Sequence, residues 1–163
     1  MDEDRLNSSK RLNGKAKFLQ AAIKKGYELS FTHTNLEGIG TADIVAKPTG
    51  YVIGCLYEIP EEMLGRLDQV EGVNSGAYKR VKMNVTRIDG APTKSSEPLC
   101  AITYVVVNKE RNPKTNAEYA NHILRGIITH NIDKLYFDKI RNIIIENNPR
   151  IERNLLNYST WKA

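Results

Sequence analysis

The stretch LDQVEGVNSGAY, residues 67–78, holds two carboxylates, Asp68 and Glu71, three positions apart and directly before Gly72. On a helix, residues at this spacing lie on one face, about one turn apart. A carboxylate fixed at a helix end can take a proton from a reacting group and return it, which is general acid–base catalysis. Acidic residues are also common at ordinary solvated helix ends. The spacing alone therefore leaves both a catalytic and a structural Glu71 open.

Residues 60–72, PEEMLGRLDQVEG, predict the helix that would carry both acids. Pro60 suits the first turn, and Glu61 and Glu62 interact favourably with the positive N-terminal end of a helix. An apolar face follows at helical spacing, made of Met63, Leu64, Leu67 and Val70. Gly72 is a natural stop, because glycine readily adopts the left-handed conformation that ends many helices. We therefore expect Glu71 at the C-terminal end of this helix.

Alternating apolar and polar residues predict strands before this helix. Residues 27–33 form one candidate, and residues 41–48 and 50–59 form two more. The Pro-Thr-Gly sequence at 48–50 is a turn signal, so we expect the last two strands to form a hairpin. The preceding residues 14–26 are compatible either with a helix or with an extended lead into the first strand.

Two further strands and two helices are expected after the acidic helix. Residues 78–88 and 100–108 are rich in β-branched and aromatic side chains and predict strands, joined by a polar loop from Asp89 to Pro98. Residues 116–130 and 132–148 carry apolar residues at helical spacing. Strands first and packing helices later predict an α+β fold.

A chain of 163 residues fits one domain. We expect a single domain over residues 1–163, with a core at about 27–147 and a C-terminal tail at 148–163. No feature of the sequence fixes its oligomeric state.

Charge and composition argue against several classes of partner. The 24 basic and 19 acidic residues give a net charge of +5, but the basic residues are scattered among acids and form no stripe interleaved with aromatics. Nucleic-acid binding is therefore not favoured. No apolar run approaches the length of a membrane span, and no secretory signal is recognisable at the start. We expect a cytoplasmic protein that binds neither nucleic acid nor membrane.

The sequence predicts no metal site. Cys55 and Cys100 both lie in apolar strands, where they are either small buried hydrophobes or a disulfide between neighbouring strands. His33, His122 and His130 lie far apart along the chain, without a ligand spacing such as CxxC or HxxxH. We expect no bound metal.

Four segments in this order resemble the gamma-glutamylcyclotransferase-like (AIG2-like) family: GTADIVAKPTGYVIGCLYEI, LDQVEGVNSGAYKR, AITYVVVN and NAEYANHILRG. They fall within residues 40–130, and LDxxEG followed by a nearby tyrosine is the most specific. The resemblance implies a small mixed β-barrel flanked by helices, with a pocket at one end. It implies a small-molecule γ-glutamyl partner whose α-amine attacks its own side-chain carbonyl, releasing an amine and leaving 5-oxoproline. No cofactor is implied, and the identity of the γ-glutamyl compound is not readable from the sequence.

One departure from the family concerns the start of the chain. Family members open with a short apolar strand ending in a YGSN loop, whose backbone amides hold the carboxylate of the substrate. This sequence lacks both and begins MDEDRL. Either the start codon has been placed too late, or the protein has lost half of the pocket. An in-frame upstream sequence encoding such a strand and loop would indicate the first.

The resemblance assigns Glu71 as the general acid and base that moves the proton of the attacking amine to the leaving amine. The helix end and burial would both disfavour its charged form. Asp68 is interpreted as structural, accepting hydrogen bonds from turn amides at residues 74–76.

The resemblance also places three tyrosines at the substrate. Tyr119 is expected to bind it, while Tyr78 and Tyr104 either hydrogen-bond the reacting groups or only pack within their strands. Two functions follow for the whole chain. It is a γ-glutamyl cyclotransferase, or it is a non-catalytic small-molecule-binding or regulatory module of the same fold.

Overall fold

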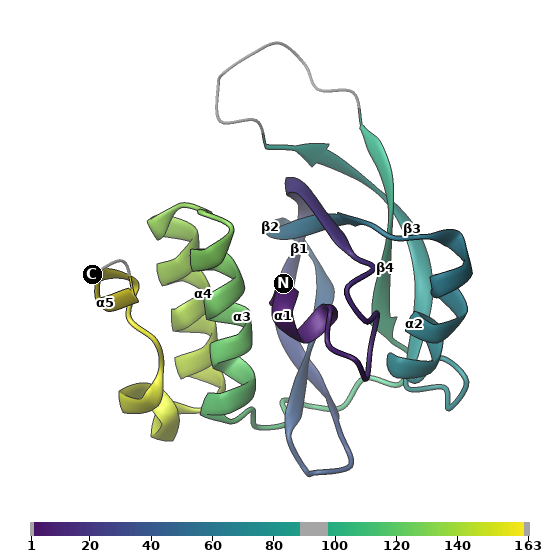
Figure 1. The fold of residues 1–163 in the computed structure, drawn as a ribbon. Coiled ribbons are helices and arrows are strands. Elements are labelled where there is room, and N and C mark those ends of the chain that lie inside the picture. Colours follow the sequence, from purple (N-terminus) through teal and green to yellow (C-terminus); the bar gives the residue numbers. More distant parts are fainter. Residues whose placement is uncertain (1, 89–97, 162–163) are drawn as a thin grey trace. The chain divides into compact units, whose positions relative to one another are not determined.

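A computed structural model describes residues 2–88 and 98–161 (Figure 1). The chain divides into two compact units. We call Glu3–Glu28 with Ile44–Val107 the pocket unit, and Met1–Asp2, Leu29–Asp43 and Asn108–Ala163 the helical unit. The organisation as one functional domain, expected from the chain length, stays a prediction.

The strands form one antiparallel sheet with the order β2-β1-β3-β4. They are β1 (Lys17–Thr34), β2 (Gly40–Glu58), β3 (Tyr78–Arg87) and β4 (Leu99–Val106). Over the described residues this sheet is open, with β2 and β4 at its edges, so the expected closed barrel is not formed. Closure requires the two edge strands to pair, and barrels filled by side chains usually need about eight strands. The mixed α+β class is confirmed.

Strand β2 differs from the predicted hairpin at residues 48–50. It runs without a turn from Gly40 to Glu58, passing through Pro48. Proline has no N–H to donate, but an edge strand has one side without a partner, and there the missing donor is tolerated. A Cβ at Gly50 would lie 2.7 Å from the carbonyl oxygen of Tyr27, so the glycine allows a close approach of β1. The Pro-Thr-Gly sequence therefore marks an edge and a close contact, and the predicted turn is wrong.

Strand β1 resolves the ambiguity of residues 14–26. It is extended from Lys17 onward, and its central residues Ala22 and Ile23 pair with Arg87 and Thr86 of β3. The predicted strand at 27–33 is therefore the second half of one long strand. Part of the expected loop at 89–98 lies outside the described residues.

The predicted acidic helix is confirmed. Its start is the 3-10 helix η1 (Glu61–Met63), which continues as α2 (Leu64–Val70). Glu71 is the C-terminal cap; its N–H donates to the carbonyl of Leu67 at 2.9 Å, and the N–H of Gly72 donates to the carbonyl of Gln69 at 3.1 Å. Gly72 has a φ of +70°, a conformation that most other residues adopt only with strain. Glu71 is therefore held between a helix and a fixed turn.

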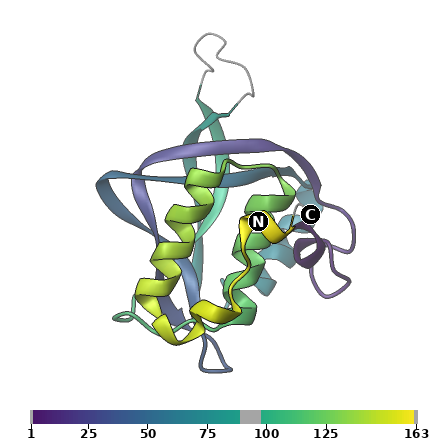
Figure 2. The ribbon, with the colours of Figure 1, turned by 90° about the vertical axis from the view of Figure 1, so that its left-hand side faces the viewer.

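The helical unit contains both predicted C-terminal helices, α3 (Ala117–Thr129) and α4 (Lys134–Asn147). They lie side by side and run in opposite directions in both views (Figure 1 and Figure 2). Each is capped by a side chain, since Asn116 accepts from the N–H of Tyr119 and Asp133 accepts from the N–H of Tyr136. Their facing residues are fully buried, among them Leu124, Ile127, Ile140 and Ile144.

The tail packs on these helices. After α4 the chain forms η2 (Pro149–Asn154) and α5 (Tyr158–Trp161). The ring of Tyr158 lies edge-on to Phe137 with 5.3 Å between centroids, and Leu155 is buried. None of the helices in the described part of the chain has the length and apolarity needed to cross a membrane.

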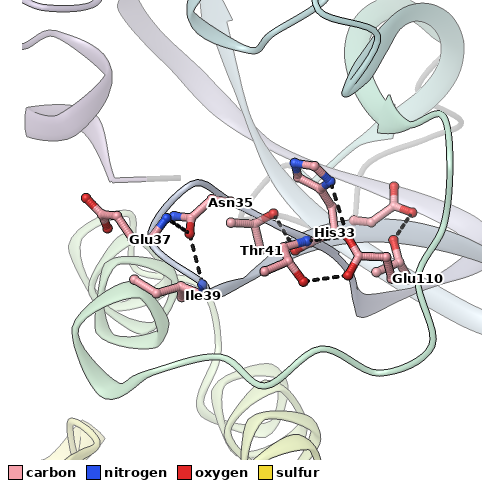
Figure 3. Close-up of polar contacts among 9 residues, drawn as sticks. His33, Asn35, Glu37, Ile39, Thr41 and Glu110 are labelled. Carbon is pink, nitrogen blue, oxygen red and sulfur yellow. Dashed lines mark hydrogen bonds and ion pairs between the residues drawn. The ribbon is translucent and has the colours of Figure 1, made fainter.

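The tip of the β1–β2 hairpin belongs to the helical unit and is shaped by Asn35. Its side-chain oxygen accepts from the N–H groups of Glu37 at 3.0 Å and Ile39 at 2.9 Å (Figure 3). Behind the tip, the hydroxyl of Thr41 donates to the carbonyl of His33 at 3.1 Å. The hairpin therefore carries its own turn and cross-strand bonds.

Glu110 joins the segment after β4 to this hairpin. Its carboxylate accepts from the N–H of Thr34 at 2.7 Å and the Thr34 hydroxyl at 2.5 Å, and lies 3.7 Å from Nδ1 of His33 (Figure 3). The hydrogen bonds from the Thr34 side chain and N–H lower the pKa of the Glu110 carboxyl.

Asp43 lies deeper in the same unit, with its carboxylate fully buried. It accepts from the hydroxyl of Thr32 at 2.8 Å and forms an ion pair with Lys109, whose side chain is 43% exposed. A buried charge of this kind is tolerated because it is both paired and hydrogen-bonded.

Candidate functional site

The pocket unit contains a cavity of about 520 Å³. Its walls come from the N-terminal segment, β1, the end of β2, α2 and β4. Most lining side chains are apolar, among them Leu12, Leu19, Leu56, Leu64, Leu67 and Ile102. Glu71 and Tyr104 add a carboxylate and a phenol to the same lining. An apolar cavity of this size with few polar groups is typical of a small-molecule site.

Glu71 is paired with Arg11 from the N-terminal segment. The two atoms Nη1 of Arg11 and Oε1 of Glu71 are 2.8 Å apart, and the side chains are 21% and 26% exposed. The sequence led us to expect only the helix end and burial around this carboxylate. The site therefore includes a guanidinium that sequence reasoning missed.

The segment that carries Arg11 is fixed by α2 itself. Nη2 of Arg66 donates to the carbonyl of Ser9 at 2.7 Å, and Nε of Arg66 donates to the carbonyl of Arg11. The side chain of Asn7 closes the same segment by accepting from the N–H of Ala16 at 2.8 Å and donating to its carbonyl at 2.9 Å. Arg66 and Glu71 therefore hold the Arg11 segment at two points.

Asp68 holds Tyr104 and Arg80 at the edge of the pocket. The Tyr104 hydroxyl donates to Oδ1 of Asp68 at 2.7 Å, and Nη1 of Arg80 lies 3.5 Å from Oδ2. Arg80 and Tyr104 are direct partners in the β3–β4 register, so they share one face of the sheet. The expected side-chain bonds from turn amides to Asp68 are replaced by these two contacts. A structural role for Asp68 fits the arrangement, but through different partners.

Burial and the hydrogen bond to Asp68 raise the pKa of Tyr104 well above its ordinary value of 10.0. The phenol is therefore neutral at physiological pH. Because its proton points to Asp68, the oxygen offers only lone pairs to a bound molecule.

The other two tyrosines lie outside the lining of the cavity. Tyr78 begins β3 two residues before Arg80, on the same face of the strand. Tyr119 belongs to the helical unit, where its hydroxyl accepts from the N–H of Ala42 at 3.1 Å. The structure thus brings together Glu71 and Tyr104, and the substrate-binding roles of Tyr78 and Tyr119 stay predictions.

Comparison with known proteins identifies the family. The model of the AIG2-like family matches residues 51–140, more than half of the chain, including α2, Glu71 and Tyr104. The chain belongs to the AIG2-like family. No curated protein matches the sequence.

Solved structures share the AIG2-like fold of this chain. A structure described as gamma-glutamyl cyclotransferase is 21% identical, with a TM-score of 0.74, covering 85% of this chain and 79% of its own. An uncharacterized protein from Homo sapiens is 23% identical, with a TM-score of 0.70 and coverage of 80% and 76%. YkqA from Bacillus subtilis is 24% identical, with a TM-score of 0.71, covering 88% of this chain and 50% of its own. At these identities the likeness concerns the fold alone.

Both cysteines line the pocket of this AIG2-like chain, and both thiols are free. Burial raises the pKa of the Cys55 thiol to about 11, so Cys55 is a neutral wall residue. Cys100 is exposed, which corrects the expectation that both are buried. Its strand lies at an edge of the sheet, and its register partner is the exposed Asn84.

The polar groups of the pocket are suited to proton transfer. Over residues 2–88 and 98–161 no cluster of three or more His, Cys, Asp or Glu side chains could hold a metal ion. A carboxylate can accept a proton from a reacting group and return it. Glu71 lines a mostly apolar cavity, so it can act on a polar group whose remainder is apolar.

Proposed function

We propose that this AIG2-like chain is a γ-glutamyl cyclotransferase that releases 5-oxoproline from a γ-glutamyl compound. The observation that supports it best is the carboxylate of Glu71, held by a helix cap and a guanidinium in the lining of a cavity of about 520 Å³. Family membership supports the same reaction class.

The reaction needs one carboxylate and a bound substrate. The α-ammonium of the γ-glutamyl group gives a proton to Glu71, and the free amine attacks the γ-carbonyl carbon. A C–N bond forms and closes the five-membered ring. As the bond to the leaving nitrogen breaks, protonated Glu71 returns its proton to that nitrogen. The lactam nitrogen keeps one of the three protons of the ammonium, and the second released proton follows the first through Glu71 to the leaving nitrogen. The products are the 5-oxoproline anion and an ammonium ion, so atoms and charge balance.

Arg11 and Tyr104 assist this transfer in different ways. Arg11 holds Oε1 of Glu71, so we assign Oε2 to proton transfer. The Tyr104 hydroxyl donates its hydrogen bond to Asp68, so its oxygen is left to accept a hydrogen bond from the substrate ammonium. Tyr78, on the same face of β3 as Arg80, is a further substrate-binding residue in this proposal.

The Arg11–Glu71 ion pair also favours a second candidate. Arg11 already occupies Oε1 of Glu71, so this carboxylate can serve as a structural partner of the N-terminal segment instead of as a base. In that case the chain is a non-catalytic module that binds small γ-glutamyl compounds in the same pocket.

Measurement of 5-oxoproline distinguishes the two. The purified chain is incubated with γ-glutamyl amides and γ-glutamyl amino acids, alongside the Glu71→Gln and Glu62→Gln variants. Glu62 is a matched control, because it is an exposed acid of the adjacent 3-10 helix outside the cavity lining. We expect release by the wild type and Glu62→Gln, and a loss of about 10²- to 10⁴-fold in Glu71→Gln. Binding without release by the folded wild type would support the module instead.

A further inference from the structure

The guanidinium of Arg11 uses a small part of its hydrogen-bonding capacity. An arginine side chain carries five N–H donors. In the described part of the chain this one makes a single hydrogen bond, from Nη1 to Oε1 of Glu71 at 2.8 Å. The Arg11 side chain is 21% exposed, so its other donors are not all shielded from water. Arg11 can therefore bind a second anion while it holds Glu71.

An anion bound next to Glu71 needs a cation, because a carboxylate that loses water without gaining a partner is strongly disfavoured. Among the described residues that line the cavity there is no Lys, Arg or His. Arg80, at the edge of the pocket, is engaged with Asp68. Arg11 does not line the cavity itself, but it contacts the carboxylate that does. It is therefore the cation best placed for this role.

The backbone around Arg11 is fixed before any ligand binds. The N–H of Arg11 donates to the carbonyl of Ser8 at 2.9 Å, and the side chain of the next residue, Leu12, is fully buried. Arg66 donates to the carbonyls of Ser9 and Arg11. A side chain on a backbone that is already ordered gives up less conformational freedom on binding, which favours affinity.

The substrate of the proposed reaction carries its own pair of opposite charges. The α-ammonium and the α-carboxylate of a γ-glutamyl group are bonded to the same carbon. When the ammonium lies at Glu71 to give up its proton, the carboxylate is therefore held within a few ångström of the same side chain. A carboxylate next to a guanidinium is complementary to this zwitterion. Arginine forms strong, charge-assisted hydrogen bonds with carboxylates, often through two N–H groups at once.

We propose that Arg11 binds the α-carboxylate of the γ-glutamyl group while Glu71 receives the proton of its α-ammonium. This inference rests on the cyclotransferase function proposed above and adds a substrate-binding residue to it. The contact comes from a side chain, in contrast to the backbone amides of the YGSN loop that the family resemblance implies. The Arg11–Glu71 pair thus has two roles, since it joins the N-terminal segment to α2 and recognises both charges of the substrate.

Paired substrates test the proposal. Each γ-glutamyl amide is compared with the 4-aminobutanoyl amide of the same amine, which lacks the α-carboxylate and cyclises to 2-pyrrolidinone. The measured quantity is the ratio of the two kcat/KM values. We expect Arg11→Met to lower this ratio by about 10- to 100-fold, because the guanidinium contacts the carboxylate of one substrate alone. Any effect of the substitution on Glu71 itself changes both rates and cancels in the ratio, as does the difference in basicity between the two amines.

Three further variants make the result decisive. Lys10→Met is the matched control, because Lys10 is exposed, precedes Arg11 directly and does not line the cavity. It should leave the ratio unchanged. Arg11→Gln keeps a hydrogen-bond donor for Glu71 and removes the charge, so it should lower the ratio even if Arg11→Met does not fold. An unchanged ratio in the folded Arg11 variants would overturn the inference. So would a fall in Arg80→Met in place of the Arg11 variants.

Failure of the reaction itself is recognised separately. The lactams 5-oxoproline and 2-pyrrolidinone differ by the carboxylate alone and do not react further, so calorimetry measures their binding. If no substrate yields its lactam, the cyclotransferase proposal fails. A preference of the wild type for 5-oxoproline that is lost in Arg11→Met would then still support Arg11 as a carboxylate-binding residue. Equal affinities for the two lactams, no binding of either, or a preference that survives in Arg11→Met would reject it.

Discussion

Arg11 and Glu71 are 60 residues apart in the chain, yet Nη1 of the first lies 2.8 Å from Oε1 of the second. The pair joins the N-terminal segment to the end of α2, within the pocket unit. Through this pair Arg11, which the sequence analysis did not single out, contacts the proposed catalytic carboxylate.

Removal of this pair should weaken the fold slightly. Both side chains are about a quarter exposed, so water screens part of the attraction, and the pair is expected to contribute about 0.5–1 kcal/mol. A double-mutant cycle of Arg11→Met and Glu71→Gln, followed by urea unfolding, measures that coupling. The coupling energy should fall at high salt. A value of zero would mean that the pair does not persist in solution.

Tyr104 should make stability depend on pH in the alkaline range. Its pKa is raised above 10.0 in the folded state by burial and by the hydrogen bond to Asp68. Below the unfolded pKa this contribution is fully present, and it is lost as the pH rises from about 10 towards the folded pKa. The wild type should therefore lose more stability than Tyr104→Phe between about pH 9 and pH 11. Other groups titrate in both proteins, so only the difference between the two is interpreted, and parallel curves would contradict the prediction.

The two pocket thiols should differ in reactivity. Cys100 is exposed, whereas the pKa of Cys55 is raised to about 11 by burial, which keeps it in the unreactive thiol form. Iodoacetamide at about pH 8 should label Cys100 well before Cys55 in the native protein. Peptide mapping by mass spectrometry measures both rates, and urea should remove the difference. Faster labelling of Cys55 in the native state would refute the assignment.

Asp43 and Lys109 should respond unequally to substitution. Lys109→Met takes the ammonium away from a fully buried carboxylate, whereas Asp43→Asn removes the buried charge and leaves a lysine that is 43% exposed to water. Loss of one partner of a buried pair costs about 3–5 kcal/mol when a charge stays buried. We expect Lys109→Met to lower the free energy of unfolding by more than Asp43→Asn. Denaturant unfolding compares them, with Lys134→Met, from an exposed pair with Asp138, as the control. Equal losses would indicate that water reaches Asp43.

The sequence predicted the parts of the site that depend on local signals. The helix carrying Asp68 and Glu71 follows from acids at its start, one apolar face and Gly72 at its end, and all three act within a few residues. The pairing of Tyr104 with Asp68 was not predicted, because it depends on the register between β3 and β4.

Other features could not be predicted from the sequence, because they depend on contacts with residues far away in the chain. Arg11 lies in a segment with no periodic pattern, and its position is set by Arg66 and Glu71. Residues 48–50 read as a turn, since Pro and Gly usually interrupt strands. Pro48 and Gly50 are tolerated within β2 because that strand lies at the edge of the sheet, and no local sequence pattern encodes this position.

The proline in β2 has a consequence for the behaviour of the protein at high concentration. An exposed edge strand offers free backbone groups to a strand of another molecule, and growth by such pairing leads to aggregation. Pro48 has no backbone N–H to donate in the middle of this edge, and the neighbouring Lys47 is also exposed. A long edge is thereby divided into two short pieces, neither of which is a good template for intermolecular β-sheet growth.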